Sequence, residues 1–67
     1  MAVNPDFLWI RRGTRIKLIH AAHTAVGKDD IGIAQSGPDD RNAFYAIYHT
    51  KKGEQRLLTL GHEVKAA

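Results

Sequence analysis

The most regular hydrophobic pattern lies in the second half of the chain, where FYAIYHTKKGEQRLLTL covers residues 44–60. Apolar and polar residues alternate on both sides of a short turn, a pattern typical of a β-hairpin. With Gly53 third in a three-residue loop, the predicted register pairs Thr50 with Glu54. Further along, it pairs Tyr48 with Arg56, Ile47 with Leu57, Ala46 with Leu58, Tyr45 with Thr59, and Phe44 with Leu60.

A two-residue loop would shift this register by one residue and place Lys51 opposite Glu54. Both registers leave large apolar side chains on both faces of the hairpin. One face can pack against the rest of the domain. The other face then needs a second layer, a partner chain or a ligand to cover it.

Two further strands are predicted upstream of the hairpin. Residues Thr14–His20 begin with an alternation that turns Ile16 and Leu18 inward. Residues Ile31–Gln35 form a second short apolar run, in which Gly32 indicates a bulge or a close backbone approach. The hairpin supplies the remaining strands, which we expect over Asn42–Thr50 and Glu54–His62, and SGPDD at 36–40 reads as a loop.

A helix from Arg15 to Val26 is the alternative to the first strand, and the assignment of residues 19–26 stays open. The choice affects His20 and His23 of the HAAH segment. Spacing three would bring both rings to one face of a helix, where they could share a metal ion, whereas a strand would separate them. We favour the strand and expect no metal site.

A short helix is predicted from about Pro5 to Arg12, before the first strand. The start signal is Asn4-Pro5-Asp6, in which Asn caps, Pro fits the first turn and Asp complements the helix dipole. Gly13 stands where a helix C-cap is expected. Two turns are too few to be stable alone, so this helix must pack against the sheet.

The length of 67 residues predicts one small domain. Such a chain buries only about 60% of its unfolded surface, and the absence of cysteine excludes a disulfide staple. We therefore expect a homo-oligomer. The longest apolar run, residues 7–10, is far below the ~18 residues of a membrane span, and no secretory signal is visible, so a cytoplasmic protein without membrane contact is predicted.

Positive charge is concentrated in two parts of the chain, and the net charge is +3. Residues 11–17 carry four cations and no acid, and residues 51–56 carry a second cluster that includes Glu54. Clustered Lys and Arg are the electrostatic footprint of nucleic-acid binding. The alternative is an ordinary solvated surface of mixed charge.

Motifs for catalysis are missing. Ser36 is the one serine and lacks a glycine-flanked nucleophile turn. Asp29-Asp30 and Asp39-Asp40 lie in Gly- and Pro-containing segments, where adjacent acids usually form turns. Gly27-Lys28 lacks a preceding phosphate-binding loop. We therefore expect no enzymatic activity and no cofactor.

Aromatic residues interleaved with cations give the leading functional hypothesis, a non-enzymatic nucleic-acid-binding module with little base specificity. Small β modules bind single strands by stacking bases on exposed aromatic rings beside a basic groove. Tyr45 or Trp9 would stack, while Lys and Arg would contact phosphates. The predicted site residues are Arg11, Arg12, Arg15, Lys17, Tyr45, Lys51, Lys52 and Arg56.

Two other functions are considered. The first is a protein–protein adaptor or inhibitor, of the kind that bacterial phages or mobile elements carry, which would bind a host protein through a sheet face or edge. The second is a toxin-like ribonuclease that would use His62 and nearby cations.

Two segments are similar to known families. NPDFLWIRRGTRIKLI at residues 4–19 resembles the start of Sm-like RNA chaperones, in which a short helix with a Phe-Leu pair and arginines leads into the first barrel strand. FYAIYHTKKGEQRLLTLGHE at 44–63 is similar to the last hairpin of RelE/ParE-type toxins, where the resemblance covers Gly61 and His62. We assign the chain to neither family.

The predicted fold class is mainly β. We expect a short N-terminal helix followed by a four- to five-stranded antiparallel sheet, which curls or closes into an SH3-like or Sm-like small barrel.

Overall fold

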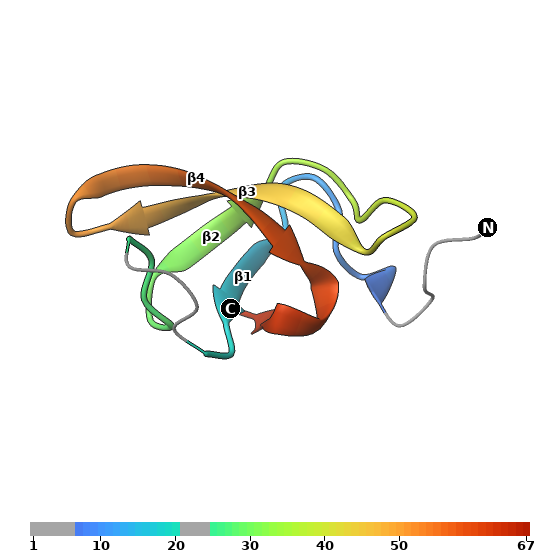
Figure 1. Cartoon of the computed structure of the whole chain (residues 1–67), viewed down its shortest axis with the longest axis horizontal. Helices are drawn as coiled ribbons and strands as arrows, with labels where there is room; N and C mark the ends of the chain where they lie inside the picture. Colours follow the sequence, from blue (N-terminus) through green and yellow to red (C-terminus); the bar gives the residue numbers. More distant parts are fainter. Residues whose placement is uncertain (1–6, 21–24) are drawn as a thin grey trace.

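The computed structural model describes residues 7–20 and 25–67, and these form one five-stranded antiparallel sheet with the order β4-β3-β2-β1-β5 (Figure 1). A short 3-10 turn, η2, joins the last two strands. The elements are β1 (Arg15–Leu18), β2 (Ile31–Ala34), β3 (Ala43–Thr50), β4 (Gly53–Leu60), η2 (Gly61–Glu63) and β5 (Val64–Ala66). The prediction of a mainly β, antiparallel fold is confirmed.

One face of the sheet carries the core. In Figure 1 the long hairpin of β3 and β4 lies across the shorter strands β1 and β2, and β5 runs beside β1. Alternate residues of the strands point to the same cluster, because successive side chains of a strand face opposite sides. The buried apolar residues are Ile10, Ile16, Leu18, Val26, Ala34, Phe44, Ala46, Tyr48 and Val64.

A close contact between β2 and β3 determines the shape of this core. Gly32 pairs with Tyr48, and a Cβ atom on Gly32 would lie 2.5 Å from Cε2 of the tyrosine ring. Glycine therefore allows the ring to lie directly against the backbone of β2, which confirms the predicted close approach. The buried Tyr48 hydroxyl is satisfied by Thr59 Oγ1 of β4 at 3.0 Å.

The hairpin register differs from both predicted registers. Thr50 pairs with Gly53, so the turn consists of Lys51 and Lys52 alone. Gly53 has a left-handed φ of 105°, as the pattern predicted, but it is the first residue of β4 and not the last residue of the loop. A register change of one residue exchanges the two faces of β4.

The exchange of faces changes which β4 side chains enter the core. Leu57 and Thr59, opposite Ala46 and Phe44, lie on the core side, whereas Leu58 is 52% exposed. The prediction placed Leu58 and Leu60 opposite the inward residues of β3, and it was wrong. The hydrogen bond between Tyr48 and Thr59 explains why a threonine takes the inner position, since a buried phenol needs a partner.

The other predicted strands are confirmed with changed ends. The strand predicted at Thr14–His20 is shorter, Arg15–Leu18, and those predicted at Ile31–Gln35 and Asn42–Thr50 each lose one terminal residue. The alternative helix from Arg15 is wrong over the residues described, while positions 21–24 of that segment, with His23, lie outside them. A fifth strand, Val64–Ala66, lies beyond the four predicted ranges.

The predicted N-terminal helix is not seen over residues 8–12. Phe7 belongs to a 3-10 turn, and Pro5 and Asp6 lie outside the described residues. One turn remains, in which the Ile10 N–H donates to the Phe7 carbonyl at 3.0 Å. The apolar residues of the predicted helix still reach the core: Ile10 is buried, and the Phe7 ring packs against Gly61. These apolar contacts hold the segment against the sheet with a single turn in place of a two-turn helix, which would have little stability of its own.

Strands β4 and β5 form the two edges of the sheet, and within residues 7–20 and 25–67 they do not pair with each other. The expected barrel closure is therefore not seen in the strand pairing. Over the same residues, no helix has the length and apolar character needed to cross a membrane.

Candidate nucleic-acid interface

The strand register aligns four side chains in a row across the face opposite the core, here called the outer face. Arg15 pairs with Ile33, Ile33 with Ile47, and Ile47 with Arg56. All four occupy strand positions that alternate with buried ones, so they project away from the core. The row therefore has a guanidinium at each end and two half-buried isoleucines between them.

A second row carries more charge. Lys17 of β1 pairs with Lys65 of β5, and Ile31 of β2 pairs with His49 of β3. His49 in turn lies opposite Glu54, with Nδ1 and Oε2 separated by 3.6 Å. Both of these side chains are more than half exposed, so the contact contributes at most about 1 kcal/mol. The β1–β5 end of the row is purely cationic.

Tyr45 provides an aromatic ring on the same face. It is 44% exposed, and the Arg56 guanidinium carbon lies 4.4 Å from its ring centroid. This geometry is a cation–π contact, worth about 0.5–1 kcal/mol at an exposed site. Leu58, opposite Tyr45 in the register, is 52% exposed. The outer face thus combines an accessible ring, apolar surface and cations.

Acidic residues are nearly excluded from the strands, since Glu54 is the one acid among β1 to β5. The loop acids are engaged by the backbone. Asp39 Oδ1 accepts hydrogen bonds from the N–H groups of Arg41 and Ala43, at 2.8 and 3.0 Å. These bonds lower the pKa of Asp39, and the bond from Ala43 has the largest effect. Asp30 Oδ2 accepts the Gly27 N–H at 2.8 Å. Both contacts agree with the interpretation of these acids as turn formers.

The predicted site residues fall into three groups. Four lie on the outer face, two precede β1 and two form the hairpin turn. Arg11 and Arg12 lie near the last residue of β2, because the N–H of the following Gly13 donates to the Ala34 carbonyl. The hairpin turn lies near the first residue of β2, because Ile31 pairs with His49, close to the end of β3. The two flanking groups are therefore at opposite ends of the sheet. The face group is Arg15, Lys17, Tyr45 and Arg56, and the flanking groups are Arg11 with Arg12 and Lys51 with Lys52.

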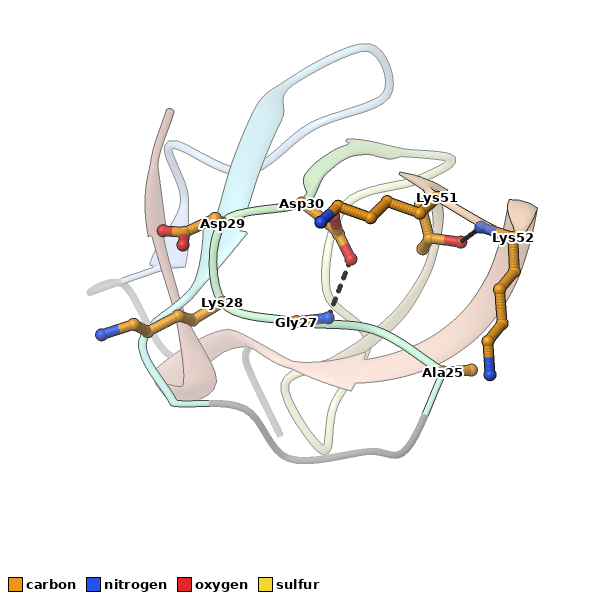
Figure 2. Close-up of a pocket in the computed structure, with 8 residues that line it drawn as sticks. Ala25, Gly27, Lys28, Asp29, Asp30, Lys51 and Lys52 are labelled. Atoms are coloured by element: carbon orange, nitrogen blue, oxygen red, sulfur yellow. Dashed lines mark hydrogen bonds between the residues drawn. The ribbon is translucent and has the colours of Figure 1, made fainter.

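The hairpin turn borders an open hollow of about 440 Å³. Figure 2 shows Lys51 directed towards Asp30. Lys28 also lines the hollow. The other lining residues include Gly27, whose N–H is bonded to Asp30. Opposite charges face each other here, so the hollow is not a dedicated anion site.

Metal-binding clusters of three or more His, Cys, Asp or Glu side chains do not occur within the part of the chain that the structure describes. His20 and His62 are both exposed. His62 lies in η2, where its neighbour Glu63 caps the turn by accepting the Leu60 N–H at 3.0 Å.

Lys65 is the cation that the sequence reasoning missed. It belongs to β5, a strand of three residues, Val64–Ala66. The signal in the sequence was one apolar residue, Val64, followed by the polar Lys65. An alternation of two residues is too short to distinguish a strand from a loop. The place of Lys65 next to Lys17 depends on a pairing between distant parts of the chain.

Comparisons with known proteins give no match. No protein-family model, no curated protein and no solved structure is similar to this chain at a significant level. Function must therefore be argued from the site itself.

Proposed function

We propose that the protein binds single-stranded nucleic acid on the outer face of its sheet. The observation that carries the proposal is the exposed Tyr45 ring on a sheet face with four strand cations and a single acid. Basic sheet faces with exposed aromatic rings suit single strands, because rings stack with unpaired bases while Lys and Arg contact phosphates. The four cations are Arg15, Lys17, Arg56 and Lys65.

Stacking would occur at the pair formed by Tyr45 and Arg56. The guanidinium covers part of one ring face at 4.4 Å. A base can stack on the open part of the ring or on the flat guanidinium itself, since both present π surfaces. The neighbouring isoleucines of the central row offer apolar contact that does not distinguish one base from another.

Base specificity is expected to be low. Bidentate readout of a base edge requires amide or guanidinium groups held in a fixed orientation. The amide of Gln35, which follows β2, donates to the Ile33 carbonyl at 2.9 Å. Both arginines of the row are exposed, and only a surface contact with the Tyr45 ring holds Arg56. Affinity would therefore come mainly from phosphate contacts and would depend strongly on salt.

The proposal includes the finer points of the predicted architecture. We infer an SH3-like small-barrel type of sheet, supported by the meander from β1 to β4 and by the return of β5 to β1. Arg11, Arg12, Lys51 and Lys52 would extend the cationic track beyond each end of the face.

The test is fluorescence anisotropy of labelled single-stranded RNA and DNA, titrated with the protein between about 50 and about 200 mM salt. The expected result is binding that weakens steeply with salt, with a slope of about −0.7 per phosphate neutralised. Absence of binding at the low-salt end would refute the proposal.

Matched variants assign the binding to the outer face. Replacing Arg15, Lys17 and Arg56 together with Gln should make the salt slope shallower, by about 0.7 for each phosphate that the variant no longer neutralises. Lys28→Gln is the control for the single face variant Lys17→Gln, because each removes one positive charge and Lys28 lies in the loop before β2, outside the strands. An equal decrease of affinity in both single variants would show that net charge, and not this face, determines binding.

Tyr45→Ala separates stacking from charge. We expect a loss of about 1–3 kcal/mol in binding, roughly 5- to 150-fold, with the salt slope unchanged. A shallower salt slope with unchanged affinity at high salt would contradict stacking. It would show instead that the Tyr45 ring positions the Arg56 guanidinium, which it contacts.

A protein partner is the second candidate, and the exposure of Leu58 beside Tyr45 favours it. An apolar interface would show a shallow dependence on salt, whereas phosphate contacts give a steep one. The same titration therefore separates the two functions once a ligand has been found.

A further inference from the structure

The outer edge of β4 lacks most of the features that usually protect an edge strand. Natural sheets block such edges with proline, charged side chains, bulges or short strands. Of these, β4 has only charge, and its two charged residues, Glu54 and Arg56, are of opposite sign. Strand β4 is eight residues long, contains no proline, and pairs with β3 without a bulge from Gly53 to Leu60. Within the described residues no other strand covers its free side.

The hydrogen bonds show which residues of β4 face this edge. The Gly61 N–H donates to the Asn42 carbonyl at 2.7 Å, one step beyond the last pair of the β3–β4 ladder. Because hydrogen-bonded pairs alternate in an antiparallel ladder, the odd-numbered residues of β4 bond to β3 and the even-numbered residues point outward. Leu60 agrees with this, since its N–H donates to Glu63 Oε1. Among residues 7–20 and 25–67, the outward backbone N–H and C=O groups of Glu54, Arg56 and Leu58 have no strand partner.

Charge selects one way for this edge to pair with a second copy. In an antiparallel pair about a two-fold axis at Gln55, Glu54 of each copy lies opposite Arg56 of the other, on the outer face. Moving the axis one residue towards the turn would place Glu54 opposite itself, and moving it one residue the other way would place Arg56 opposite itself. Opposite charges stabilise such cross-strand pairs and like charges destabilise them.

We propose that two copies of the chain associate through their β4 edges, antiparallel, with Gln55 at the two-fold axis and reciprocal contacts between Glu54 and Arg56. Both charged side chains are exposed and available, because their present contacts with His49 and Tyr45 are surface contacts of small energy. Pairing would also satisfy the outward backbone groups of the edge.

The association joins the two sheets into one continuous sheet. The outer faces of both copies then lie side by side, because side chains on one face of a strand pair stay on that face across the new ladder. The inference does not rest on the proposed function, since a protein without affinity for nucleic acid would pair in the same way.

Charge reversal is the first test. Glu54→Arg would place arginine opposite arginine, and Arg56→Glu would place glutamate opposite glutamate. We expect sedimentation velocity to show a dimer for the wild type, a mainly monomeric protein for each single variant, and a dimer again for the double exchange. A monomeric wild type at every concentration, or single variants that dimerise as strongly as the wild type, would overturn the proposal.

Cysteine cross-linking is the second test and does not depend on charge. The chain has no cysteine, so Gln55→Cys introduces a single thiol at the proposed axis. Cα atoms of a non-hydrogen-bonded antiparallel pair lie about 4.5 Å apart, which lies within the range of a disulfide. We expect rapid formation of a covalent dimer on mild oxidation.

Glu54→Cys and Arg56→Cys are the matched controls, one residue to each side. In the proposed register neither residue meets its own copy, so both variants should cross-link slowly. Preferential cross-linking at either control position, or equal rates at all three, would contradict the register. Circular dichroism of each variant confirms that the fold is intact.

Discussion

The two faces of the β3–β4 hairpin show opposite relations between sequence and environment. Phe44 and Tyr45 are neighbours in the chain, yet the first is 2% exposed and the second 44%. On the inner face, side chains fit against one another at short distances, as Tyr48 does against Gly32. On the outer face, a guanidinium and an accessible ring meet at the surface.

This difference indicates how the two faces respond to change. The inner face is constrained by shape and by the need to satisfy one buried hydroxyl pair, so small changes of volume or polarity should cost stability. The outer face is constrained by charge and exposure, so its residues can be exchanged with little effect on folding. Stability and binding should therefore be impaired through different residues of the same strand.

The largest effect is expected from Phe44→Ala, compared with Tyr45→Ala. Truncation of the buried ring should lower the free energy of unfolding by about 3–5 kcal/mol, a large part of the stability of a small domain. Tyr45→Ala should change it by less than about 1 kcal/mol. Urea denaturation measures both. Comparable decreases in the two variants would show that the outer face is covered in solution.

A smaller decrease in stability is expected from Gly32→Ala. The added methyl group would lie 2.5 Å from Cε2 and 2.7 Å from Cδ2 of Tyr48, so the ring or the strand must shift. Overpacking of this kind costs about 1–3 kcal/mol. Gly27→Ala is the control, because its Cβ would meet only Asp30 Oδ2, at an ordinary 3.6 Å. We expect Gly27→Ala to be nearly neutral, and a neutral Gly32→Ala would contradict the close contact.

Thr59→Val tests the polar pair within the core. The substitution keeps the shape but leaves the buried Tyr48 hydroxyl without its partner, which should cost about 1–2 kcal/mol. Adding Tyr48→Phe removes the stranded hydroxyl, so the double variant should be more stable than the sum of the two single effects implies. A double-mutant cycle by chemical denaturation measures this coupling. Strict additivity would mean that the two hydroxyl groups do not interact.

The smallest effect concerns Asp39, in the turn that sets where the alternation of β3 begins. Its folded pKa lies below the ordinary value of 3.8, chiefly because the Ala43 N–H bonds to the carboxylate. The resulting stability is present above about pH 4 and disappears as the pH falls through the folded pKa. Asp39→Asn should be slightly less stable than the wild type at neutral pH and should show a smaller fall in thermal stability at acid pH, where the wild type loses the same contribution. A variant with the same acid profile as the wild type would exclude this contribution.

Alternation along the sequence predicted much of the sheet. It located β2, β3 and β4 and oriented β1 correctly, because Ile16 and Leu18 alternate with cations and are both buried. It also placed Arg15 and Lys17 on the outer face. These features depend on the two-residue period of a strand, which can be read locally.

The remaining features depend on contacts between distant segments. The register of the hairpin could not be read from the turn sequence, because Gly53 fits the end of a loop as well as the start of a strand. The inward position of Thr59 follows from the hydroxyl of Tyr48. Lys65 joins the candidate site only through the pairing of β5 with β1. In each case a tertiary contact overrides the local pattern.

The position of β1 between β2 and β5 has a consequence for the time course of folding. The hairpin of β3 and β4 joins neighbouring residues and can form within microseconds. Strand β1 gains its second neighbour only when Val64 reaches Leu18, across most of the chain. Closing such a long loop lowers the chain entropy before the stabilising contacts between β1 and β5 have formed, and this entropy loss slows folding. Assembly of this sheet should therefore begin in its longest hairpin and end where its first strand meets its last.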